Sequence, residues 1–402
     1  MLIQNPRPWT YRLPVALALL APFNLLASLG MDLYLPLVPL MPGILGTSPA
    51  WIQLTLTLYM VALGAGQILF GPLSDRFGRR PVLIGGALLF ALASFALAAS
   101  ASALPFLILR LLQAIGASAT LVALFATVRD VYAEKAESAV IYSLMNAMLA
   151  FVPALGPFAG ALIADAWGWR ALFIALGLPA AVLLFLALPV WHETRPAREK
   201  PDKISFAPML RSAAFRTYTL AFGTAMGTFF VFFSIAPRVL IEGAGFSALR
   251  FSLAFASVAC AMIVTSRFAQ GLVARWGIAG SAIRGMALLI AGALMLLLNH
   301  FLLPLSFWSF IAPMWVMAIG IVFTTSVTAN GALREFGHLA GTAVALHFCL
   351  QSLIVGVLGT ACVVLLNGNT SWPLIVYGGG MAAITLLVLL RLRDPAPRSA
   401  SA

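Results

Sequence analysis

Apolar segments of about twenty residues recur along the whole chain, and they limit what it can fold into more than any other feature. A bilayer core about 30 Å thick is crossed by a helix of roughly 20 apolar residues. Hydrophobic residues make up 62% of the 402 residues and charged residues only 9%. We therefore predict an all-α membrane protein with twelve spanning helices. The predicted spans are 13–37, 51–71, 82–100, 104–128, 139–164, 170–190, 217–237, 249–273, 282–300, 305–328, 340–366 and 372–391.

The first span could be mistaken for a secretory signal peptide, because Arg7 and Arg12 precede it. Its apolar run of about 25 residues exceeds the 7–15 residues of a signal-peptide core. No small-residue cleavage site follows promptly, so we interpret the segment as a helix.

The basic residues predict the orientation, because Lys and Arg are retained on the cytoplasmic side of a membrane. With the N-terminus inside, twenty basic residues are cytoplasmic or at that interface, and Arg110 lies in the membrane. Only Arg170, Arg238 and Arg250 fall outside. Both termini are thus predicted to be cytoplasmic. The net charge of +12 reflects this topology and does not indicate a nucleic-acid partner, which would need a basic soluble face.

The longest polar connection, residues 192–216, divides the chain into two sets of six helices. We predict an N-terminal half (1–191), a cytoplasmic linker (192–216) and a C-terminal half (217–402). An internal repeat agrees with this division, because RFG at 76–78 and RWG at 275–277 are 199 residues apart. Parallel repeats of six helices are one layout of secondary transporters.

The residues that would support a redox, metal or ATP site are not grouped in the sequence. Cys260, Cys349 and Cys362 lie in apolar segments, where cysteine behaves as a small hydrophobe. The four histidines are scattered singly, and there is no Gly-x-x-x-x-Gly-Lys loop for ATP. We expect no cofactor and no metal, and the absence of clustered acids and histidines argues against an intramembrane enzyme.

The connection between the second and third spans, GPLSDRFGRRP (71–81), holds four charges in eleven residues. Gly71, Pro72 and Gly78 predict a tight reversal. The loop resembles the signature G-x-L-x-D-R-x-G-R-R of the major facilitator superfamily, which implies the major facilitator fold and a cytoplasmic gate that latches its two halves. An alternative is that Arg79 and Arg80 are only positive-inside anchors, but this does not explain an acid between glycines. The residues that match are Gly71, Leu73, Asp75, Arg76, Gly78, Arg79 and Arg80.

Two more signatures of this superfamily lie in the fourth and fifth spans. Arg110, Gln113 and Gly116 match its buried-arginine motif, and Gly156, Pro157 and Gly160 match its antiporter motif. Gly156 and Gly160 provide a small-xxx-small face for close helix approach, and Pro157 removes a helix hydrogen bond. Simple helix packing is the alternative reading of this second motif.

Arg110 suggests where proton coupling takes place. A guanidinium within a membrane helix costs at least about 2.5 kcal/mol on insertion scales and usually faces a cavity or a partner. Asp32 is the only carboxylate clearly within a predicted span, and it lies at a depth similar to that of Arg110. We hypothesise that Asp32 faces a central cavity and exchanges the proton, with Arg110 near enough to affect its protonation. A static ion pair between the two is the alternative.

Longer stretches resemble the phenicol exporters, the twelve-helix drug:proton antiporters of chloramphenicol and florfenicol. They include APFNLLASLGMDLYLPLVPLMP, AMGTFFVFFSIAPRVL, VTANGAL and LLNGNTSWP. The resemblance implies efflux by alternating access from a bacterial inner membrane, antibiotic resistance, a small neutral amphipathic drug and H+ as partners, and a monomer. An exporter of a sugar or amino acid on the same fold is the alternative; a channel fits the gate signature poorly.

One departure from these relatives concerns proton coupling. Asn24 stands where they carry an acidic residue, and an amide cannot titrate. Either Asp32 alone carries the proton or this chain is deficient in coupling.

The drug would contact apolar walls that carry a few polar groups. Phe229, Phe230, Phe232 and Phe233 share one face of the seventh span, which could instead face lipid or core. Each polar candidate could instead form a bond between helices. These candidates are Asn24, Gln53, Tyr59, Gln67, Gln113, Asn146, His347 and Gln351.

Overall fold

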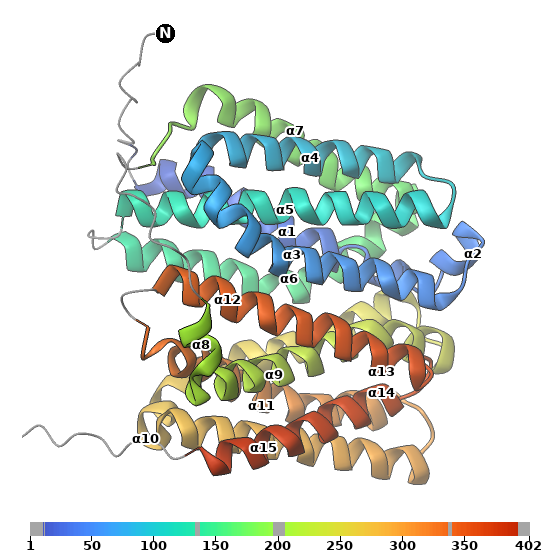
Figure 1. Cartoon of the computed structure of the whole chain (residues 1–402). Helices are drawn as coiled ribbons and strands as arrows, with labels where there is room; N and C mark the ends of the chain where they lie inside the picture. The colour runs from blue at the N-terminus through green and yellow to red at the C-terminus, as the bar shows by residue number, and fades with distance from the viewer. Residues whose placement is uncertain (1–10, 12, 133–136, 196–205, 337–339, 393–402) are drawn as a thin grey trace, which may run out of the picture. The chain divides into compact units, whose positions relative to one another are not determined.

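The computed structural model describes residues 11, 13–132, 137–195, 206–336 and 340–392, and every regular element in these ranges is a helix (Figure 1). The first long helices are α1 (Leu13–Asp32), α3 (Pro49–Phe77), α4 (Arg79–Ala99), α5 (Ala103–Tyr132), α6 (Glu137–Trp167) and α7 (Trp169–Val190), with the short α2 (Met41–Leu45) before α3. The later helices are α8 (Ala207–Arg211), α9 (Ala213–Pro237), α10 (Ala248–Leu302), α11 (Phe307–Leu333), α12 (Ala340–Leu353), α13 (Thr360–Leu365), α14 (Trp372–Leu374) and α15 (Ala382–Arg391).

Ten helical stretches in the described part of the chain are long and apolar enough to cross a membrane. A shorter apolar stretch, Phe151–Trp167, belongs to α6. The 55-residue α10 contains two of the predicted spans, and its only non-helical residue is Gly277. Every one of the twelve predicted spans therefore coincides with a helix or a run of consecutive helices, and the all-helical membrane architecture is confirmed.

Several spans contain π-helical turns, either at the end of an α-helix or where one α-helix continues into the next. Arg238–Gly243 follows α9, Ile354–Gly359 joins α12 to α13, and Ile375–Met381 joins α14 to α15. Such turns often occur at functional sites because they leave some backbone groups without the usual partner. The hydropathy pattern predicts these spans but not their change of helix type.

The chain forms two compact units. Unit 1 contains the described residues of 1–204 and of 233–259, and unit 2 contains those of 205–232 and of 260–402. Within unit 1, α4 packs against α5 and α7, and α3 packs against α5 (Figure 1). One unit boundary, between 204 and 205, lies in the predicted linker 192–216, and the other two lie inside α9 and α10. The two predicted halves stay a prediction.

Single glycines make the sharpest turns between long helices. Gly78 (φ 111°, ψ 159°), Gly168 (φ 81°, ψ 167°) and Gly277 (φ 69°, ψ −178°) occupy a backbone region that is essentially restricted to glycine. The prediction that Gly71 and Pro72 also form the reversal was wrong, because both lie inside α3, which continues to Phe77. A proline costs the helix one hydrogen bond but has a helical φ, so the whole reversal can take place at Gly78.

Paired glycines let two helices cross with their backbones in contact. A Cβ on Gly116 of α5 would lie 2.6 Å from the amide nitrogen of Phe90 in α4, and one on Gly86 would lie 2.8 Å from the Gly116 carbonyl. In unit 2, a Cβ on Gly285 of α10 would lie 2.7 Å from the Gly320 carbonyl of α11. Gly116 of the buried-arginine motif thus brings the helix that carries Arg110 against α4.

Candidate functional site

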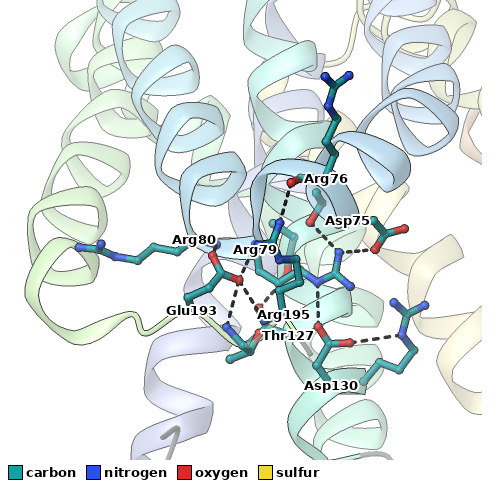
Figure 2. Close-up of polar contacts among 12 residues, drawn as sticks. Asp75, Arg76, Arg79, Arg80, Thr127, Asp130, Glu193 and Arg195 are labelled. Atoms are coloured by element: carbon teal, nitrogen blue, oxygen red, sulfur yellow. Dashed lines mark hydrogen bonds and ion pairs between the residues drawn. The ribbon is translucent and has the colours of Figure 1, made fainter. Parts of the chain in front are cut away.

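The first group of predicted residues lies at the turn between α3 and α4, and Figure 2 shows its polar contacts. The Arg79 side chain is only 4% exposed. Its Nη1 donates to Asp75 Oδ1 at 2.5 Å, and its Nε donates to Asp130 Oδ2 at 2.7 Å. Asp130 is nearly buried (6%), whereas Asp75 is 61% exposed. The signature arginine is therefore held by two acids, one inside the signature and one at the end of α5.

A third carboxylate binds the first turn of α4. Glu193, just after α7, accepts hydrogen bonds from the backbone N–H groups of Arg79 (2.8 Å) and Arg80 (3.2 Å) (Figure 2). An anion at a helix N-terminus is stabilised by the helix dipole and by the unpaired N–H groups there. A Cβ on Gly78 would overlap the Glu193 carboxylate. Gly78 is thus needed both for its positive φ and for the space that Glu193 occupies.

The basic side chains of this loop also bind locally. Arg195 Nη1 donates to the Arg76 carbonyl at 2.6 Å, and Arg80 Nη2 donates to the Leu188 carbonyl at 2.7 Å. The end of α7 and the segment after it are therefore attached to both sides of the α3–α4 turn. All these contacts lie within unit 1, so a latch between the two halves stays a prediction.

Asp130 and Glu193 were not among the predicted site residues. Each is an acidic residue beside basic ones at the predicted cytoplasmic end of an apolar span, in VRD (128–130) and HETR (192–195). That position could have marked both as partners for the signature arginines, but the sequence does not specify which atoms they bind.

The second group surrounds Arg110, which is completely buried in α5. Its Nη1 donates to the Gly30 carbonyl and to Gln113 Oε1, both at 2.7 Å. The guanidinium carbon lies 4.9 Å from the ring centre of Tyr34 and 4.5 Å from that of Tyr59, both favourable cation–π distances. Between the described side chains of Asp32 and Arg110 there is no ion pair, so the static-pair alternative is not what this structure contains.

Asp32 is the last residue of α1 and is 7% exposed. The antiporter motif packs directly on it: a Cβ on Gly156 would lie 2.6 Å from the Asp32 Cβ, and one on Gly160 would overlap the Leu33 carbonyl oxygen. The carbonyl of the third motif residue, Pro157, accepts a hydrogen bond from Ser252 Oγ at 3.1 Å. The two motif glycines and the buried acid, predicted independently, thus form one contact between α1 and α6.

Asn24 lies two turns before Asp32 in α1 and is 1% exposed. Its Nδ2 donates to the Met145 carbonyl of α6 at 3.2 Å. The Tyr59 hydroxyl of α3 donates to the Ala27 carbonyl of α1 at 2.7 Å. Gln113 Nε2 donates to Ser94 Oγ at 2.8 Å. Asn24, Tyr59 and Gln113 therefore already bond neighbouring helices, and the side chain of Asn146 lies outside the described residues.

The aromatic face of α9 is inside the protein. Phe230, Phe232 and Phe233 are at most 4% exposed, and Phe229 is half-buried. Phe232 stacks on Phe310 with ring centres 5.9 Å apart, and Phe233 packs edge-on against Phe255. The alternative that this face contacts lipid is therefore wrong for the three buried rings.

The remaining polar candidates lie in different places. Gln53 Nε2 donates to Ser234 Oγ at 3.1 Å, and Arg238 Nη2 lies 3.4 Å from Gln53 Oε1. Gln67 is half-buried in α3. His347 and Gln351 are buried in α12, where His347 Nδ1 lies 2.9 Å from Thr219 Oγ1 of α9. Among the described residues, no three His, Cys, Asp or Glu side chains are grouped as a metal site would need.

Comparison with known proteins shows what this arrangement resembles. The family model described as Major Facilitator Superfamily matches residues 20–360. A chloramphenicol resistance protein of Pseudomonas aeruginosa is 50% identical over 380 residues, which is 94% of this chain and 90% of the relative. A multidrug resistance protein MdtL of Shewanella oneidensis is 28% identical over 89% of this chain and 91% of its own.

Solved structures show the same fold at low sequence identity. A bacterial homologue of the human lysosomal transporter Spinster superposes with a TM-score of 0.71 and 14% identity, covering 96% of both chains. A POT family transporter superposes with a TM-score of 0.72 and 13% identity, covering 94% of both chains.

Proposed function

Because this chain belongs to the Major Facilitator Superfamily, a family of membrane transporters and not of enzymes, we propose that it exports phenicol antibiotics such as chloramphenicol and florfenicol in exchange for protons. It is a multi-pass protein of the bacterial inner membrane. The observation that carries the proposal is its 50% identity, over 94% of its length, to a chloramphenicol resistance protein.

A phenicol is a neutral molecule with an aromatic ring at one end and hydroxyl and amide groups at the other. Sites for such ligands have mostly apolar walls and a few fixed hydrogen-bonding groups. The described spans provide many aromatic side chains. Of their buried acids, Asp130 is bound to Arg79 at the end of α5, and Asp32 has no ion-pair partner among the described residues. With little negative charge available, a lipophilic cation should be a poorer substrate than a neutral phenicol.

Asp32 is the proposed proton carrier. In the cycle, a proton from outside binds Asp32, the drug leaves outward, and the carrier returns to release the proton inside. Arg110 binds the Gly30 carbonyl two residues before Asp32. The Tyr59 ring, which packs on the guanidinium, is near enough to interact electrostatically with both Arg110 and Asp32. The arginine would therefore stabilise the α1 backbone beside the acid without neutralising the acid in an ion pair.

The antiporter motif would transmit the change of charge. Gly156 and Gly160 leave no side-chain layer between α6 and the Asp32–Leu33 segment. A shift of this segment when Asp32 gains or loses its proton would therefore move α6 directly. Exchange of a neutral drug for one proton moves net charge, so transport should respond to voltage, worth about 2.3 kcal/mol per charge per 100 mV, as well as to pH.

The experiment is drug susceptibility of a phenicol-sensitive bacterium that expresses this chain. We expect resistance to chloramphenicol and florfenicol to rise several-fold, and to depend on Asp32. Asp165→Asn, at an exposed acid near the end of α6, is the matched control and should protect as well as the wild type. No gain in phenicol resistance from a correctly inserted protein would refute the proposal.

The multidrug resistance relatives favour a second candidate, an exporter with a broader range of drugs. Ethidium susceptibility, measured in the same strains, separates the two. Equal protection against ethidium and chloramphenicol would favour the broad range and contradict the preference for neutral drugs.

A further inference from the structure

A polar pair in unit 2 lies within aromatic side chains of α9 and α12. His347 is completely buried, and its ring is surrounded edge-on by Phe215, Phe222 and Phe348 at centre distances of 6.3, 5.1 and 5.3 Å. Thr219 Oγ1 lies 2.9 Å from His347 Nδ1 and fixes the orientation of the ring. The other ring nitrogen, Nε2, is buried and has no hydrogen-bond partner in the described structure.

Gln351 repeats this pattern one helical turn later. It is 8% exposed, its Nε2 donates to Ser352 Oγ at 2.8 Å, and its Oε1 has no partner among the described residues. Residues four apart lie on the same side of a helix. Two buried polar atoms without partners therefore lie on neighbouring positions of one helix face.

Such atoms are costly. A buried donor or acceptor without a partner lowers the stability of the folded state by roughly 1–3 kcal/mol. Native proteins rarely contain such a group unless a ligand, a water molecule or a function accounts for it. The pair is followed directly by the π-helical turn Ile354–Gly359, a kind of irregularity that often accompanies functional sites. Packing alone would be better served by apolar side chains at both positions.

We propose that the His347–Gln351 face of α12 is the site that hydrogen-bonds the polar arm of the exported drug. This inference rests on the proposed phenicol efflux and adds the residues that recognise the ligand. Gln351 Oε1 accepts only, so the ligand must offer a hydroxyl or amide N–H there. His347 Nε2 takes the second contact, as donor or acceptor according to the ring tautomer that Thr219 selects.

The aromatic surroundings define the rest of the ligand class. Phe222 and Phe348 are both half-buried and flank His347, so an aryl ring could pack against them in the offset or edge-on geometry that aromatic pairs prefer. The fitting ligand is a neutral aryl amido-alcohol. Both chloramphenicol and florfenicol have the benzylic hydroxyl and amide N–H that this site requires.

The test uses paired substitutions in the purified full-length protein and measures the chloramphenicol Kd by isothermal titration calorimetry. His347→Asn keeps an amide near the Nδ1 position toward Thr219 but removes the Nε2 group, whereas His347→Gln places an amide near Nε2. We expect His347→Asn and Gln351→Met each to raise the Kd about tenfold, the loss of one hydrogen bond. His347→Gln should stay within about threefold of the wild type, and so should Cys349→Ala, the control on the same helix.

The outcomes separate this site from the proposed function. If the wild type neither binds nor exports phenicols, the proposed function fails. If the wild type binds and exports but His347→Asn and Gln351→Met bind equally well, this site is wrong and water or packing accounts for the pair.

A second measurement observes drug binding in the wild-type protein and uses His347→Gln only to assign the resonance. In wild-type protein labelled with 15N-histidine, chloramphenicol should shift a ring Nε2 resonance that His347→Gln removes. An unshifted histidine spectrum at saturating drug would overturn the proposal.

Discussion

Arg79 and Arg110 are both buried arginines of unit 1, but the groups that surround the two guanidinium charges differ. Arg79 is bound by two carboxylates, Asp75 and Asp130. Arg110 bonds only neutral groups, the Gly30 carbonyl and Gln113, between two tyrosine rings. Its Nε and Nη2 have no hydrogen-bond partner within the described residues.

The difference indicates what each charge does. Loss of one partner from a buried ion pair strongly destabilises a protein. We therefore expect the Arg79 cluster to contribute chiefly to structure. A buried cation without an acid partner is expensive, and a membrane protein retains one mainly for function. We therefore expect Arg110 to act through its field and its hydrogen bonds near Asp32.

Removal of the acid near Arg110 should have the largest effect. Asp32→Asn should abolish proton-coupled efflux, because Asp32 is the buried carboxylate of the described spans that no arginine pairs with, whereas Asp130 is bound to Arg79. Drug-induced proton release from purified protein, measured over a pH series, should disappear while Asp165→Asn retains it. Persistent release from Asp32→Asn would transfer the coupling to another group, such as His347.

Removal of an acid from the Arg79 cluster should affect stability next. Asp130→Asn leaves the buried Arg79 guanidinium with one of its two acidic partners. The substitution should lower the free energy of unfolding by about 3 kcal/mol. A thermal unfolding series in one detergent measures this loss. Asp75→Asn is the matched control, because a 61% exposed carboxylate contributes less than about 1 kcal/mol. Equal losses from the two variants would contradict the structural role of Asp130.

Arg110→Lys tests whether charge alone suffices at the second arginine. Lysine keeps the charge but lacks the planar fork that bonds Gly30 and Gln113 while stacking on two rings. We expect the transport rate in inverted vesicles to fall about tenfold, with the protein still folded. A rate equal to the wild type would show that only the charge of Arg110 matters.

Asp75→Asn should have a smaller, kinetic effect. Its carboxylate belongs to the α3–α4 turn, which we predict to be cytoplasmic, and is remote in sequence from His347 and Gln351. Drug affinity should therefore survive while the transport rate falls a few-fold. Loss of chloramphenicol binding by a folded Asp75→Asn protein would remove the gate assignment.

Asn24→Asp should produce the smallest change, a rise of at most about twofold in protons released per drug. The Asn24 amide donates to the Met145 carbonyl, and an aspartate can make that bond only in its protonated form. The wild-type side chain thus resembles an acid that never releases its proton. An unchanged proton count with intact transport would mean that position 24 does not take part in coupling.

The spans and signatures could be predicted because they depend on neighbours in the sequence. Length and hydropathy define a membrane helix, and fixed spacing defines the motifs around Asp75, Arg110 and Gly156. The Arg79–Asp130 ion pair could not be predicted in this way, because 51 residues separate its members. Glu193 is 114 residues from Arg79, and only the folded chain shows that its carboxylate fits beside Gly78.

The same limit applies inside the membrane. Matching depths brought Asp32 and Arg110 together in the sequence-based hypothesis, but depth does not specify rotation about a helix axis. The structure directs Arg110 toward Gly30, Gln113 and two tyrosines, and places Gly156 against Asp32. Rotation is set by packing between helices, which a hydropathy pattern does not encode.

The glycine turns at Gly78, Gly168 and Gly277 also have a consequence for the gene. Every single-base change that alters a glycine codon introduces an L-residue or a stop, and none of those residues adopts the mirror-image extended backbone easily. These three codons therefore tolerate substitution poorly, even where, as at Gly277, a Cβ would meet no neighbouring atom. A screen of random mutants for lost drug resistance should find these codons enriched for missense changes over the codons of Gly85 in α4 and Gly271 in α10, where φ is not positive and a Cβ would meet nothing within 4 Å.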